Sequence, residues 1–122
     1  MPVFIVRKID TLGTIQIPRL EEEIKLFEVG GFEDDFIVEA WLDLSELKEG
    51  DILDLLEYVA IDGINYKLYM HRRYFGPLIE PIVRIHTKTY YKNMKMKISA
   101  IQIKGTPRKI DYVFITEILT TV

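Results

Sequence analysis

The stretch that decides the fold runs from Asp51 to Phe75 and reads Asp-Ile-Leu-Asp-Leu-Leu-Glu-Tyr-Val-Ala-Ile-Asp-Gly-Ile-Asn-Tyr-Lys-Leu-Tyr-Met-His-Arg-Arg-Tyr-Phe. Within it, the dipeptide Asp62-Gly63 separates two apolar runs, and Asp-Gly in such a position is a strong signal for a β-hairpin. Glycine, and aspartate to a lesser degree, tolerate the positive φ that a two-residue type I′ turn requires. The sequence therefore predicts a central hairpin with Asp62-Gly63 as its turn and the other strands packed around it.

The first half of this stretch also fits a helix, with Asp51 as its N-cap. Its apolar residues follow the spacing of one helical face: Ile52, Leu55, Leu56, Val59 and Ala60. Strand alternation instead turns another set inward, namely Leu53, Leu55, Val59 and Ile61, with Glu57 as the exception. We favour the strand, because the turn follows directly and a helix cannot enter a two-residue turn.

Turn residues divide the rest of the chain into short segments in which apolar and polar residues alternate. The strands expected outside the hairpin cover residues 3–9, 14–17, 21–29, 36–44, 83–91, 94–103 and 110–119. About eight strands at roughly ten-residue spacing predict an all-β fold, an antiparallel β-sandwich of jelly-roll or immunoglobulin-like type. The last segment is apolar on both faces, so we expect it centrally in its sheet or at a subunit interface.

Length and composition are those of one globular domain, expected to cover residues 1–122. The start of the chain does not resemble a signal peptide, and no apolar run approaches the roughly 20 residues of a membrane span. We therefore expect a cytoplasmic protein, or one assembled in the cytoplasm into a virion-like particle. The absence of cysteine excludes disulfides and zinc–thiolate sites, and with abundant Glu, Lys and Ile it is compatible with a thermophilic source.

Several turn and strand motifs occur in a fixed order: residues 41–45, 50–51, 59–63, 66–69, 85–89 and 105–108, which begin Trp41-Leu42-Asp43 and end Thr106-Pro107-Arg108. This pattern resembles uncharacterised small single-domain β-sandwich proteins of archaeal and bacterial genomes, some of them in virus-like gene neighbourhoods. The resemblance covers residues 36–119. It implies a sandwich fold and favours a role in assembly, and it implies no catalytic residues.

Motifs of enzymes are missing from the sequence. It contains no glycine-rich nucleotide loop, no Gly-x-Ser-x-Gly and no His-x-x-x-His metal pair. The two histidines, His71 and His86, could hold a metal only if neighbouring strands brought them together, and we expect them to be surface residues. The two serines, Ser45 and Ser99, have no histidine nearby in the sequence. The prediction is a non-enzymatic protein with no catalytic residues, no cofactor and no bound metal.

Charge is distributed unevenly. Residues 21–62 contain fifteen Asp and Glu but two Lys, whereas residues 67–97 contain eight Lys and Arg but one acid, Glu80. Strand alternation places cations and aromatics together on a candidate interaction face: Lys67, Tyr69, His71, Arg73, Arg84, His86, Lys88 and Tyr90. Such a surface could bind the phosphates and bases of single-stranded nucleic acid. Alternatively, the cations pair with Glu39, Asp43, Asp54 and Glu57 in the same or a neighbouring subunit.

Opposed charge blocks, seven tyrosines and a doubly apolar last strand are typical of surfaces that meet other subunits. The sequence therefore favours a structural protein that forms a homo-oligomer, such as a virus-like structural subunit, with itself as partner. The alternative hypothesis is a module that binds single-stranded nucleic acid or carbohydrate through the basic and aromatic face.

Overall fold

A computed structural model of the chain describes residues 3–121, with the side chains of all but residues 3, 6, 86–88 and 121. These residues form eight strands and no helix. The strands are β1 (Val3–Gln16), β2 (Glu23–Gly30), β3 (Phe36–Asp43), β4 (Ile52–Ala60), β5 (Lys67–Phe75), β6 (Ile82–Tyr90), β7 (Lys95–Lys104) and β8 (Lys109–Thr121).

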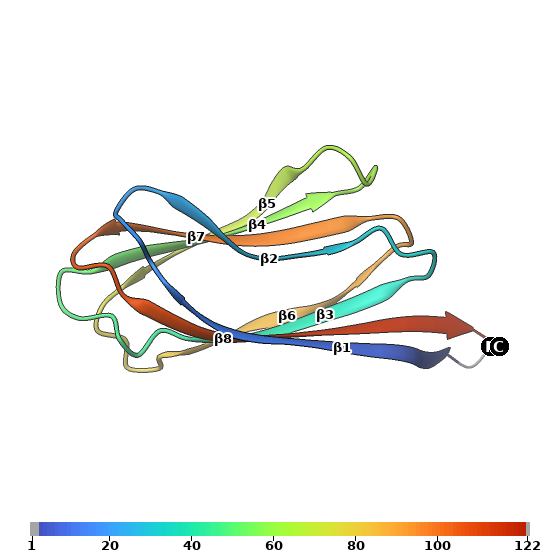
Figure 1. Cartoon of the computed structure of the whole chain (residues 1–122), viewed down its shortest axis with the longest axis horizontal. Coiled ribbons are helices and arrows are strands. Elements are labelled where there is room, and N and C mark those ends of the chain that lie inside the picture. Colours follow the sequence, from blue (N-terminus) through green and yellow to red (C-terminus); the bar gives the residue numbers. More distant parts are fainter. Residues whose placement is uncertain (1–2, 122) are drawn as a thin grey trace.

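The strands form two four-stranded sheets that lie face to face as two layers (Figure 1). The first sheet has the order β1-β8-β3-β6 and the second has the order β2-β7-β4-β5, and all pairings are antiparallel. An immunoglobulin sandwich would instead place its first two strands side by side in one sheet. Here β1 pairs with β8, β2 with β7, β3 with β6 and β4 with β5, which makes the sandwich a jelly roll.

The predicted strand over residues 52–60 is confirmed, because β4 pairs with β5 from Ile52–Phe75 to Val59–Lys67. The predicted two-residue turn is wrong, since six residues connect the two strands and Asp62 does not adopt a positive φ. The Asp62 carboxylate instead accepts hydrogen bonds from the backbone N–H groups of Asn65 and Ile64, at 2.7 and 2.9 Å. These bonds hold the pKa of Asp62 at about 2 and stabilise a wider loop than a type I′ turn.

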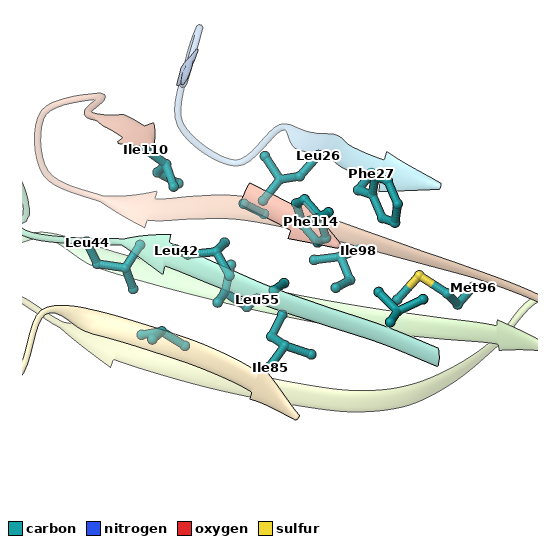
Figure 2. Close-up of a cluster of buried hydrophobic side chains, with 14 of the residues drawn as sticks. Leu26, Phe27, Leu42, Leu44, Leu55, Ile85, Met96, Ile98, Ile110 and Phe114 are labelled. Atoms are coloured by element: carbon teal, nitrogen blue, oxygen red, sulfur yellow. The ribbon is translucent and has the colours of Figure 1, made fainter. Parts of the chain in front are cut away.

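Alternation in the sequence predicts the core correctly in β3. Phe36, Val38, Ala40 and Leu42 are all at most 2% exposed and face the opposite sheet, as does Leu44 just beyond the strand. Figure 2 shows Leu42 and Leu44 between the layers, together with labelled side chains from β2, β7 and β8. At the centre, the rings of Phe27 and Phe114 stack with centroids 4.2 Å apart.

The two ends of the chain form one long ribbon. The two strands expected over residues 3–9 and 14–17 are a single strand, β1, because its pairing with β8 continues through Thr11 and Gly13. Strand β8 lies between β1 and β3, so the doubly apolar last strand is central in its sheet as expected. In Figure 1, β1 and β8 run side by side past the ends of the other strands.

Replacement of Phe114 by alanine should destabilise the sandwich strongly, because its buried ring packs against Phe27 and Tyr112. We expect a loss of about 3–5 kcal/mol in the free energy of unfolding, measured by urea denaturation. The matched control is Phe4→Ala, since Phe4 is 52% exposed, and it should change the free energy by less than about 1 kcal/mol. Equal losses in the two variants would contradict the position of the core.

Two glycines with positive φ allow the hairpin loop to be tested. A Cβ at Gly63 (φ 77°) would lie 2.5 Å from the Asn93 carbonyl oxygen, whereas a Cβ at Gly50 (φ 90°) would meet no atom within 4 Å. Gly50→Ala should therefore cost only the strain of the left-handed backbone, about 1–2 kcal/mol. Gly63→Ala should cost clearly more by urea denaturation, and an equal cost would show that the hairpin loop does not approach Asn93.

Candidate functional site

The eight residues of the predicted interaction face belong to strands of two different sheets. Lys67, Tyr69, His71 and Arg73 belong to β5, at the edge of one sheet, and the other four belong to β6, at the edge of the other sheet (Figure 1). Consecutive strands often pair, but the segment 76–81 here crosses from one layer to the other. The predicted side-by-side arrangement of β5 and β6 is therefore wrong, and so is any pairing of His71 with His86 across neighbouring strands.

Tyr90 is buried rather than exposed. The register of β3 and β6 shifts between Val38–Lys88 and Ala40–Ile85, so β6 contains an extra residue that reverses its alternation. Tyr90 consequently stacks on Phe36 with centroids 5.0 Å apart, and its hydroxyl donates to a Glu57 carboxylate oxygen at 3.0 Å. Burial and the neighbouring Glu57 carboxylate raise the pKa of Tyr90. The side chains of His86 and Lys88 lie outside the described residues.

A second bulge divides the residues of β5. Glu57 lies opposite Met70, but the next residue, Tyr58, lies opposite Leu68, so Tyr69 is the extra residue. His71 and Arg73, on one side of the bulge, lie opposite Leu56 and Asp54 on the outer face of their sheet. Lys67 and Tyr69, on the other side, line a cavity at the end of the sandwich.

The described cations of the predicted face are largely neutralised within the chain. Arg73 donates two hydrogen bonds to Asp54, at 2.8 and 2.9 Å, and His71 lies 2.9 Å from the same carboxylate. Arg84 pairs with Glu39 at 3.1 Å and lies over the Trp41 ring. Cross-strand pairing of cations with Asp54 and Glu39 is thus confirmed, and it weakens the case for a face that binds nucleic acid.

The other two acids expected to pair with these cations have different partners. Asp43 accepts a hydrogen bond from the Ser45 backbone N–H at 2.9 Å, and Glu57 is buried beside Tyr90. Strand alternation places Glu57 inward as the polar exception, and the structure buries it there with 1% exposure. No group of three or more possible metal ligands occurs among the residues that the structure describes.

A cavity of about 610 Å³ lies at the end of the sandwich where the β4–β5 hairpin and the end of β6 diverge. Its lining is mainly apolar and includes a few polar groups: Val59, Ile61, Asp62, Asn65, Lys67, Leu68, Tyr69, Thr89, Tyr90 and Met94. Ile61 and Leu68 are 79% and 54% exposed. The sequence does not predict this cavity, because the cavity forms only when β5 and β6 lie in different sheets. The one sequence feature that points to it is the apolar character of the residues at the hairpin ends.

A second exposed apolar group lies at the other end of β5 and β6. Phe75 and Ile82 flank the connection between these strands and are 60% and 53% exposed. Between them, Ile79 is 99% exposed. Isolated surface hydrophobics are ordinary, but groups of large ones on a small protein indicate contact with another molecule.

No protein-family model matches this chain, and no curated protein matches it either. Among solved structures, the chain is similar to the crystal structure of the infectious bursal disease virus VP2 subviral particle. The TM-score is 0.54, the sequence identity is 13%, and the match covers 92% of this chain and 32% of the viral chain. This chain therefore spans about a third of the length of the viral protein, and the likeness concerns the fold alone.

The described residues include no helix of the length and apolar character that a membrane crossing requires.

The pairing of Asp54 with Arg73 and His71 should make the free energy of unfolding depend on pH. Hydrogen bonds from Arg73, opposed by burial and supported by His71, hold the pKa of Asp54 below its ordinary value of 3.8. The carboxylate therefore stabilises the fold fully above about pH 3.8, and its contribution is lost as the pH falls through the lowered folded-state pKa. Asp54→Asn should reduce the free energy of unfolding by about 2 kcal/mol at pH 7, less than for a fully buried pair because Arg73 is half exposed.

Urea denaturation of the wild-type protein and the Asp54→Asn variant between pH 7 and pH 2.5 measures the difference in their free energies of unfolding. This difference should shrink below about pH 3.8. The matched control is Asp10→Asn, because Asp10 and Lys8 form an exposed pair at 3.6 Å and should contribute less than about 0.5 kcal/mol. A difference for Asp54→Asn that stays constant across this range would show that the pair does not depend on the carboxylate charge.

Proposed function

We propose that this protein is a non-enzymatic structural subunit that associates with copies of itself into a homo-oligomer, as the subunits of a virus-like particle do. The observation that carries the proposal is the grouping of exposed apolar side chains at the two ends of the β5 and β6 edges. These side chains are not needed by the core, which is already filled by other residues of both sheets.

The exposure of these apolar side chains to water makes an unpartnered state unfavourable. Removing apolar surface from water contributes roughly 25 cal/mol per Å², so several large side chains together can drive association. Ile61, Ile64 and Ile79 are each at least 79% exposed, and each could bury most of its area against a second subunit. Charged residues scattered between the apolar groups would then direct the partners into one arrangement.

The fold supports the same proposal. A jelly roll presents its loops at two ends and its sheet edges at two sides, so subunits can meet without any change in the core. The similar viral chain is described as part of a subviral particle, and that description belongs to the viral protein. A particle assembled in the cytoplasm from copies of this chain is the form of the proposal that fits both the sequence and the fold.

Size-exclusion chromatography with light scattering tests the proposal at protein concentrations from one to several hundred micromolar. The expected mass is a multiple of 14.3 kDa. Because apolar contacts carry the association, it should persist in 1 M NaCl, where exposed ion pairs are screened within about 3 Å, and strengthen in sulfate. A mass of one chain at every concentration and in every salt would refute the proposal.

A further inference from the structure

The loop that joins β5 to β6 has the features of a loop that inserts into a partner protein. Pro77 and Pro81 restrict its backbone, and both of its ends are anchored. The Gly76 N–H donates to the Asp51 carbonyl oxygen at 3.0 Å, and the Leu44 N–H donates to the Pro81 carbonyl oxygen at 2.9 Å.

The anchored loop holds one apolar side chain in solvent. Leu78 packs against the core, whereas its neighbour Ile79 is 99% exposed. A rigid loop that presents one large apolar side chain loses little conformational entropy when that side chain is buried by a partner.

The cavity beside the β4–β5 hairpin has the features of a pocket that accepts such a side chain. Its volume of about 610 Å³ is in the range of ordinary binding pockets, and its walls are formed mainly by Val59, Leu68, Met94 and the Tyr90 ring. The ring of Tyr90 is fixed by its stacking on Phe36 and its hydrogen bond to Glu57, so this wall is preformed. An isoleucine side chain with its neighbouring backbone can enter such a space.

The charges beside the loop and the cavity are complementary. Glu80 follows Ile79 directly, and Lys67 forms part of the cavity wall. Within the described residues neither Glu80 nor Lys67 has an ion pair or a side-chain hydrogen bond. The other acid of the cavity, Asp62, is already occupied by its bonds to Ile64 and Asn65.

The loop over residues 76–81 and the β4–β5 hairpin, whose residues line the cavity, lie at opposite ends of the sandwich (Figure 1). Strand β5 runs from Lys67 at the cavity to Phe75 at the loop, a length of about 30 Å for nine residues. One molecule therefore cannot insert its own loop into its own cavity, but each molecule offers one loop and one cavity to its neighbours.

We infer that Ile79 of one copy inserts into the cavity of the next copy, with Glu80 paired to Lys67 across the contact. This inference rests on the proposed self-association and specifies its geometry. Because the loop and the cavity are different surfaces, the contact is heterologous, and subunits join head to tail. Such contacts form a closed ring when the rotation between neighbouring subunits closes, and an open filament when it does not.

Two variants remove the two halves of the contact. Ile79→Asp places a charge on the inserting side chain, and Leu68→Glu places one in the cavity. Each should weaken self-association roughly a hundredfold, as expected for the central residues of an interface. The matched controls, Ile5→Asp and Leu12→Glu, alter residues of β1 that are 56% and 73% exposed and lie outside the contact, and they should leave association unchanged. Circular dichroism and thermal unfolding verify that all four variants fold.

A mixing experiment tests the head-to-tail geometry. The Ile79→Asp variant keeps an intact cavity, and the Leu68→Glu variant keeps an intact loop. Each alone should be monomeric, whereas an equimolar mixture should form one-to-one dimers and nothing larger. Light scattering detects this outcome directly. Failure of the mixture to dimerise, with both single variants monomeric, would overturn the head-to-tail contact.

A charge exchange tests the paired residues. Glu80→Lys and Lys67→Glu should each weaken association about tenfold, and the double variant should recover most of it, because the pair is then reversed. If the wild-type protein is oligomeric but Ile79→Asp and Leu68→Glu leave it so, the inference fails while the proposed function stands. A monomeric wild-type protein would refute the proposed function as well.

Discussion

The structure depends on the antiparallel pairing of β4 with β5, because all other pairings are nested around that hairpin. Strand β3 pairs with β6, β2 with β7 and β1 with β8, so each later strand returns to a partner from the first half of the chain. The nested pairs are then divided between two layers that close over one core. This division separates β5 from β6, and it therefore determines which side chains can act together on a surface.

Much of this arrangement could be predicted from local patterns. The alternation of Phe36, Val38, Ala40 and Leu42 identifies inward positions because a strand exposes alternate side chains to opposite faces. The doubly apolar Ile110–Leu119 segment indicates a central strand for the same reason. The partners of each strand could not be predicted, since the residues that pair β8 with β3 are no different in kind from those that would pair it with β7.

Bulges explain most of the errors in the predicted interaction face. A single extra residue in β6 turns Tyr90 into the core, and another in β5 separates Tyr69 from His71. No sequence signal marks these positions, because a bulge is fixed by the register of the partner strand rather than by the residue itself. The charge pattern, by contrast, predicts two of the ion pairs correctly. Arg73 pairs with Asp54 and Arg84 pairs with Glu39, as cross-strand pairing of opposite charges requires.

Turn motifs that are far apart in the sequence also meet in one contact. The buried Asp51 carboxylate accepts hydrogen bonds from the backbone N–H groups of Lys48 and Thr106 and from the Arg108 guanidinium. Burial alone would raise the pKa of Asp51, but these donors hold it below its ordinary value. The close approach of Asp51 to Gly105 leaves no room for a Cβ there, so this glycine is needed for contact as well as for its turn.

That contact connects the core to the proposed assembly surface. The Asp51 carbonyl oxygen anchors Gly76, at the start of the loop that carries Ile79, while the Asp51 carboxylate anchors the turn between β7 and β8. The loop is therefore held by the same residue that joins the two sheets at this end of the sandwich. The loop is thus held by backbone hydrogen bonds at Gly76 and Pro81 while Ile79 stays exposed, because none of these contacts requires the Ile79 side chain.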